Sequence, residues 1–64
     1  MIITHDTSGK IQVFETAGSA YSASYENRLI FKISIPLGSG EIVHLNRKGD
    51  TWVLDQIEAC SKDQ

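Results

Sequence analysis

The sequence predicts an all-β protein, a small antiparallel meander of four to five strands in one domain. Three observations lead to this prediction. Apolar residues recur at every second position from Arg28 to Leu37, as they do in a strand with one face on a core. Turn-forming sequences recur at short intervals along the chain. The chain has 64 residues, which is enough for a single domain.

The first element is expected to be a hairpin around the turn at Asp6 to Gly9. A two-residue loop and a three-residue loop give opposite pairings of the two strands. The longer loop pairs Ile3 with Val13 and His5 with Ile11, which keeps apolar residues together more consistently. We therefore favour the three-residue loop.

The next segment, residues 16–27, is rich in Ala, Gly and Ser. Tyr21, Ala23 and Tyr25 could alternate along a strand, or the two tyrosines could lie one turn apart on a short helix. A mobile connection is the third interpretation. A variable-looking segment of this kind is also a reasonable place for recognition.

Residues 28–58 are predicted to form a three-stranded meander. A three-residue Gly-Ser-Gly loop pairs Ile33 with Leu45, and a two-residue Lys48-Gly49 turn pairs Leu45 with Trp52. Both registers place apolar residues opposite apolar residues. The resulting core face consists of Phe31, Ile33, Ile35, Val43, Leu45, Trp52 and Leu54.

The last strand is expected to end at about Glu58, and residues 59–64 are expected to fray. A helix that includes Ile57 and Cys60 is the alternative. The domain thus divides into a hairpin (1–15), a connection (16–27), a meander (28–58) and a tail. The meander either stays open or closes, fully or in part, into a small barrel. Such a barrel would be similar in strand number and length to an SH3-like barrel, although no sequence motif of that family is present.

Composition limits the function classes. Six basic residues against eight acidic ones give a formal net charge of −2, without the strongly basic face typical of general nucleic-acid binding. The N-terminus lacks the features of a signal peptide, and no apolar stretch approaches the roughly 20 residues that span a bilayer. The single cysteine, Cys60, cannot form an internal disulfide. We therefore expect a soluble cytoplasmic protein with a reduced thiol and no membrane partner.

No residue pattern indicates catalysis, a metal or a cofactor. His5, Asp6, His44 and Cys60 are of types that bind zinc, but only His5 and Asp6 are close in sequence. The Gly38-Ser39-Gly40 segment leads into a strand pattern, so it predicts a hairpin turn rather than a phosphate loop. We expect a non-enzymatic protein without metal or cofactor, too small to enclose a ligand cavity.

The outer face of the predicted meander carries the main functional hypothesis. Apolar residues occupy positions where a solvated face should be polar, and they form a patch with a charged rim. The patch is covered either by the N-terminal part of the chain or by another chain. We predict a protein–protein interaction module, a small adaptor or inhibitor that docks on a larger protein, as in bacterial or phage accessory proteins, and that forms a homodimer. The predicted partner-binding residues are Ile30, Pro36, Ile42, Val53, Tyr21 and Tyr25.

The alternative function is a small β-barrel that binds nucleic acid. Arg28 and Lys32 share one face of the long strand, and Arg47 and Lys48 lie near a hairpin tip. Together with the tyrosines, these cations would form a basic and aromatic surface on which the bases of a single-stranded nucleic acid stack. This hypothesis predicts an affinity that falls steeply with salt. The competing interpretation is that these charges keep the protein soluble and prevent a strand edge from pairing with other chains.

Overall fold

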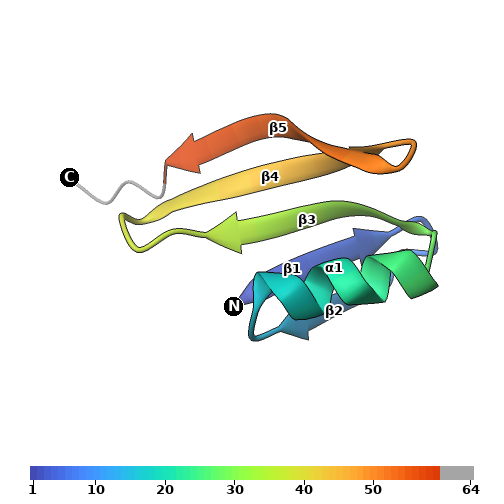
Figure 1. The fold of residues 1–64 in the computed structure, drawn as a ribbon. Helices are drawn as coiled ribbons and strands as arrows, with labels where there is room; N and C mark the ends of the chain where they lie inside the picture. The colour runs from blue at the N-terminus through green and yellow to red at the C-terminus, as the bar shows by residue number, and fades with distance from the viewer. Residues whose placement is uncertain (60–64) are drawn as a thin grey trace.

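A computed structural model describes residues 1–59, which form one antiparallel sheet of five strands and one helix (Figure 1). The elements are β1 (Ile2–Asp6), β2 (Ile11–Phe14), α1 (Ala17–Glu26), β3 (Ile30–Pro36), β4 (Glu41–Lys48) and β5 (Thr51–Ala59). The strand order is β2-β1-β3-β4-β5. This confirms the predicted small all-β class, but the sheet does not close into a barrel, because β2 and β5 remain as its two edges. Cys60 and the rest of the expected tail lie outside the described residues.

The segment with three competing interpretations, residues 16–27, contains helix α1. Its N-cap is Thr16, whose side-chain oxygen accepts a hydrogen bond from the backbone N–H of Ser19 at 3.1 Å. The two buried residues of the helix, Ala20 and Ser24, are small, which lets the helix lie close to the sheet. The helical interpretation of residues 16–27 is therefore confirmed, and the strand and the mobile connection are wrong.

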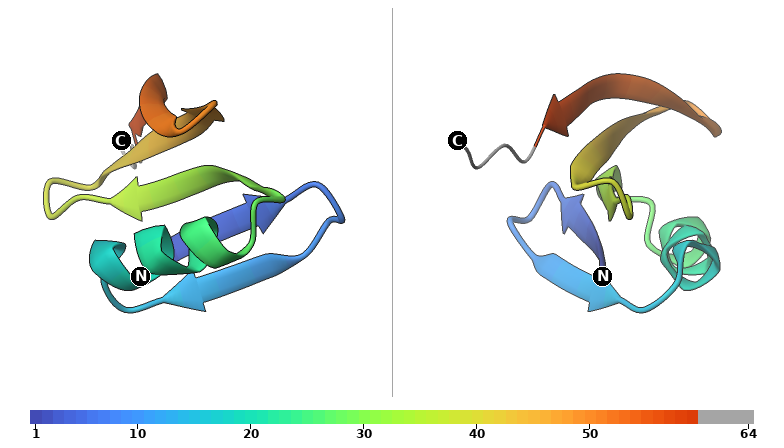
Figure 2. Two further views of the ribbon diagram at one scale, coloured as in Figure 1. Left: turned by 45° about the vertical axis from the view of Figure 1, so that its right-hand side comes forward. Right: turned by 90° about the vertical axis from the view of Figure 1, so that its left-hand side faces the viewer.

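Helix α1 covers only part of one side of the sheet. Strands β2 and β3 flank β1 and are both antiparallel to it, so α1 connects two strands that run in the same direction. The helix contacts β1, β2 and β3. Figure 2 shows α1 on one side of the curved sheet, with the hairpin end of β5 on that same side. We call the side that α1 contacts the helix side and the opposite side the open side.

The core on the helix side is small. Four hydrophobic residues are buried among the described residues, namely Ile2, Ala20, Ile30 and Ile33. Half-buried side chains extend this core, including Phe14, Tyr21, Ile35 and Trp52. The predicted core face is therefore only partly covered. Phe31, which the pairing of β1 with β3 skips, is 42% exposed, and Leu54, on the edge strand β5, is 57% exposed.

Two of the three predicted registers are correct. Ile3 pairs with Val13 across the first hairpin, as the three-residue loop requires. Ile33 pairs with Leu45 between β3 and β4. These registers follow from loop length and from the match of apolar residues across each pair of strands.

The third register differs from the prediction. Lys48 pairs with Thr51 and Leu45 pairs with Leu54, so the turn consists of Gly49 and Asp50. The first central residue of a two-residue hairpin turn needs a positive φ, and Gly49 supplies it with a φ of 63°. A Lys48-Gly49 turn would instead force that conformation on a lysine. A register shift at His44 then moves the partner of Val43 to Ile57.

A second irregularity corrects the predicted position of Ile30. The pairing of β1 with β3 shifts after His5, so that His5 pairs with Lys32 whereas Asp6 pairs with Ile30. This bulge turns Ile30 away from the face of Lys32. Ile30 is 1% exposed. It is therefore a core residue, and its predicted place on an exposed outer face is wrong.

Asp6 holds the first hairpin together and makes stability sensitive to acid. Its carboxylate accepts hydrogen bonds from the Ser8 hydroxyl (2.6 Å), from the backbone N–H groups of Ser8 and Lys10 (both 3.0 Å) and from the Asn27 amide (3.3 Å). The Ser8 hydroxyl is the main cause of a lowered Asp6 pKa. A lowered pKa in the folded state stabilises the fold above the unfolded-state pKa of about 4, and this contribution is lost as the pH falls through the folded-state value.

We therefore expect the melting temperature to fall between pH 7 and pH 3, and to fall less for Asp6→Asn than for the unmodified protein. Circular dichroism melts at both pH values measure this difference. Asp55→Asn is the matched control, because Asp55 is exposed. An Asp6→Asn protein that loses as much melting temperature as the unmodified one would contradict the role of Asp6.

Candidate functional site

The candidate site is a hollow on the open side of the sheet, with a volume of about 350 Å³. Strands β1 to β4 supply its walls and floor. None of the described elements covers it, because α1 lies on the opposite side and the β1–β2 hairpin forms one wall. We call it the open-side hollow. Its lining residues are Met1, Ile3, His5, Ile11, Ser34, Pro36, Ile42 and His44.

The structure brings together only two of the predicted partner-binding residues. Pro36 and Ile42 are directly paired across β3 and β4, and both line the hollow. Val53 pairs with Asn46 and is exposed, but it does not line the hollow. His44, which does line the hollow, pairs with Gln56 rather than with Val53, because the turn and the bulge displace β5.

A chain of three polar side chains leads from the hollow to β5. The Oγ of Ser34 lies 2.8 Å from Nδ1 of His44, and Nε2 of His44 lies 2.9 Å from Oε1 of Glu58. Ser34 and His44 are buried, so these hydrogen bonds satisfy polar groups that would otherwise be costly. Because Ser34 lies mid-strand between β1 and β4, its backbone belongs to the sheet ladders. An oxyanion would need free donors beside Ser34, so we interpret this chain as structural.

His5 lines the same hollow, and its Nδ1 is buried without a hydrogen-bond partner. Sequence spacing gave no sign that His5 and His44 would share a site, since they are brought together by the pairing of β1 with β3. Residues 1–59 contain no group of three or more His, Cys, Asp or Glu side chains that could hold a metal ion. The fourth residue of the zinc-type set, Cys60, lies outside the described part of the chain.

The two tyrosines belong to a different part of the molecule. Tyr21 is half-buried and contacts Trp52 edge-on, with ring centroids 6.1 Å apart. Tyr21 thus extends the core beneath α1. Tyr25 is exposed on the helix. Neither tyrosine joins Pro36 and Ile42 in one surface.

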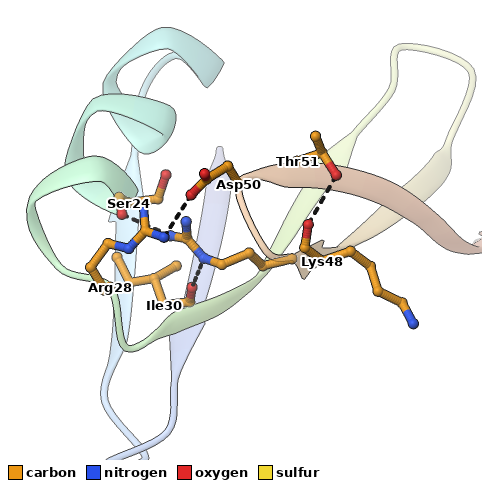
Figure 3. Close-up of polar contacts among 7 residues, drawn as sticks. Ser24, Arg28, Ile30, Lys48, Asp50 and Thr51 are labelled. Atoms are coloured by element: carbon orange, nitrogen blue, oxygen red, sulfur yellow. Dashed lines mark hydrogen bonds and ion pairs between the residues drawn. The ribbon is translucent and has the colours of Figure 1, made fainter.

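The four predicted nucleic-acid-binding cations do not form one surface either. The Arg47 guanidinium donates hydrogen bonds to the backbone carbonyls of Ile30 (3.0 Å) and Ser24 (2.7 Å), and it lies 4.9 Å from the centre of the Trp52 ring. Arg47 therefore connects β4 to α1 and β3 (Figure 3).

Of the other three cations, Arg28 lies near Arg47, since both guanidinium groups lower the pKa of Asp50. Arg28 forms an ion pair with Asp50 at 2.8 Å, which Figure 3 also shows. Lys32 is half-buried on the open side, and Lys48 is exposed. These positions give no continuous basic surface, so we propose no nucleic-acid function.

Comparisons with protein families, curated proteins and solved structures found no match. Within residues 1–59, no helix is long and apolar enough to cross a membrane.

Proposed function

We propose that this protein is a non-enzymatic protein-binding module whose contact surface is the open side of the sheet. The observation that carries the proposal is the open-side hollow, a concave surface with apolar walls that no described element covers. Concave apolar surfaces of this kind commonly mark interaction sites. Val13, which is exposed and pairs with Ile3 of the hollow, extends the apolar area along β2.

We further propose that the first partner of this surface is a second copy of the chain. The core buries few hydrophobic side chains, and a domain of this size is stabilised by only about 3–5 kcal/mol. Packing two open sides together would bury the hollow and add to that core. The charges on the rim suit a twofold arrangement, because Lys32 and Glu58 pair with positions four residues apart on β4, or about 13 Å. Lys32 of one copy can therefore approach Glu58 of the other. The dimer would leave other surfaces free for docking on a larger protein.

Ile42→Asp tests this surface, because it places a charge in the wall of the hollow. We expect the unmodified protein to have about twice the 7.1 kDa mass of one chain, and Ile42→Asp to have the mass of one chain. Light scattering after size exclusion, over a hundredfold range of concentration, measures both masses. Ile57→Asp is the matched control, since Ile57 is exposed on the helix side of β5.

Two results would contradict the proposal. A single-chain mass for the unmodified protein at every concentration would exclude self-association. An Ile42→Asp protein without a cooperative melt would show that the hollow is part of the core rather than a contact surface.

A further inference from the structure

The longest strand of the sheet has a free edge. β5 has nine residues and, among the described residues, pairs only with β4. The other edge strand, β2, has four residues. Every β5 residue except Trp52 is exposed. Figure 1 shows that β5 borders the sheet along its whole length, on the side away from α1 and β2. A free edge presents unpaired backbone N–H and C=O groups to which another strand can add.

The side chains along this edge differ on its two sides. Leu54 and Ile57 pair with Leu45 and Val43 of the helix-side face, and they are 57% and 53% exposed. The opposite side carries Glu58, and the bulge carries Asp55. Residues 51–59 contain no lysine or arginine. A strand added at this edge would therefore meet apolar side chains on one side and negative charge nearby.

We propose that the β5 edge binds an extended segment of another protein in which apolar residues alternate with lysine or arginine. Alternate side chains of an added strand point to opposite sides of the sheet. Its apolar residues would contact Leu54 and Ile57, and its basic residues would approach Glu58 and Asp55. The backbone ladder would supply affinity, and this alternation would supply specificity. The inference rests on the proposed role as a protein-binding module. It shares Glu58 with the open-side dimer, but its apolar contacts, Leu54 and Ile57, lie on the helix side.

A second copy of β5 does not suit this edge. Antiparallel pairing of two β5 strands would bring Asp55 and Glu58 of one chain close to the same acids of the other. Like charges across a strand pair are destabilising. The occupant that the charges favour is therefore a basic strand from a different protein.

The experiment uses two synthetic octapeptides, one alternating lysine with valine and one alternating glutamate with valine. Each is titrated into the isotopically labelled protein, and backbone amide shifts are followed by NMR at low salt. We expect the lysine peptide to shift the amides of residues 51–59 in a saturable way and the glutamate peptide to leave them unchanged. Equal shifts with both peptides, shifts confined to β2 or the hollow, or no shifts at millimolar peptide would overturn the proposal.

A charge-altered variant makes the test specific. In Asp55→Lys/Glu58→Gln the net charge of the edge changes sign, while the glutamine amide oxygen retains an acceptor for Nε2 of His44. Loss of two exposed charge pairs predicts about a tenfold weaker affinity for the lysine peptide. An unchanged affinity would contradict the role of the acids.

The mass in solution tests the open-side dimer, and the amide shifts of residues 51–59 test peptide binding at the β5 edge. Either proposal can therefore be contradicted without the other.

Discussion

Replacing Ile33 by aspartate should unfold the protein. Ile33 is fully buried at 0% exposure, and it lies in the middle of β3 between Thr4 and Leu45. An aspartate at this position would bury a charge without a partner, which costs several kcal/mol. A domain of this size has only about 3–5 kcal/mol of stability to lose. We expect far-UV circular dichroism to show no cooperative thermal transition.

Two controls separate this effect from a general intolerance of substitution. Ile57→Asp introduces the same charge at an exposed position of β5 and should keep a cooperative melt. Ile33→Val removes one methylene from the core and should cost only about 1 kcal/mol. If Ile33→Asp melted cooperatively near the temperature of the unmodified protein, the assignment of Ile33 to the centre of the core would be wrong.

Replacing Arg47 by alanine should destabilise the fold by about 2–4 kcal/mol, since hydrogen bonds from a charged group to buried carbonyls contribute about 1.5–3 kcal/mol. The guanidinium donates to Ser24 in the last turn of α1 and to Ile30 at the start of β3. Without it, both carbonyls lose their charged donor, and the contact with the Trp52 ring is lost as well. Urea denaturation measures the change in the free energy of unfolding.

Lys48→Ala is the matched control, because Lys48 is the exposed neighbour of Arg47. It should change stability by less than about 0.5 kcal/mol. The loss of stability in Arg47→Lys should lie between the losses in Arg47→Ala and Lys48→Ala. A single ammonium group cannot reproduce the forked geometry by which the guanidinium reaches two carbonyls. Equal effects of Arg47→Ala and Lys48→Ala would show that Arg47 does not stabilise the packing of α1.

The sequence was most informative where pairing depends on neighbouring strands and short loops. The match of Ile33 with Leu45 could be predicted because a three-residue loop fixes the register and any shift by one residue exposes the apolar set. The β4–β5 turn lies one residue later in the chain than predicted. The first turn position requires a positive φ, which glycine adopts readily and lysine does not, and this requirement places Gly49 there.

Other features could not be predicted from local pattern. The buried face of α1 consists of Ala20 and Ser24, which are too small and too polar to produce a helical hydrophobic pattern. Ile30 is buried because of a bulge that depends on the long-range pairing of β1 with β3. The same pairing brings His5 and His44 to one hollow. Of the predicted partner-binding residues, only Pro36 and Ile42 lie on adjacent strands of a correctly predicted hairpin, and they are the residues found together.

The strand order has a consequence for the folding pathway. Three of the four strand pairings join sequence neighbours across short loops. Only the pairing of β1 with β3 joins distant segments, with Thr4 opposite Ile33, and α1 lies within the loop that this pairing closes. Closing that loop costs chain entropy before any contact compensates for it. We therefore expect the two hairpin regions to form early and independently, and the docking of β1 against β3 to set the folding rate.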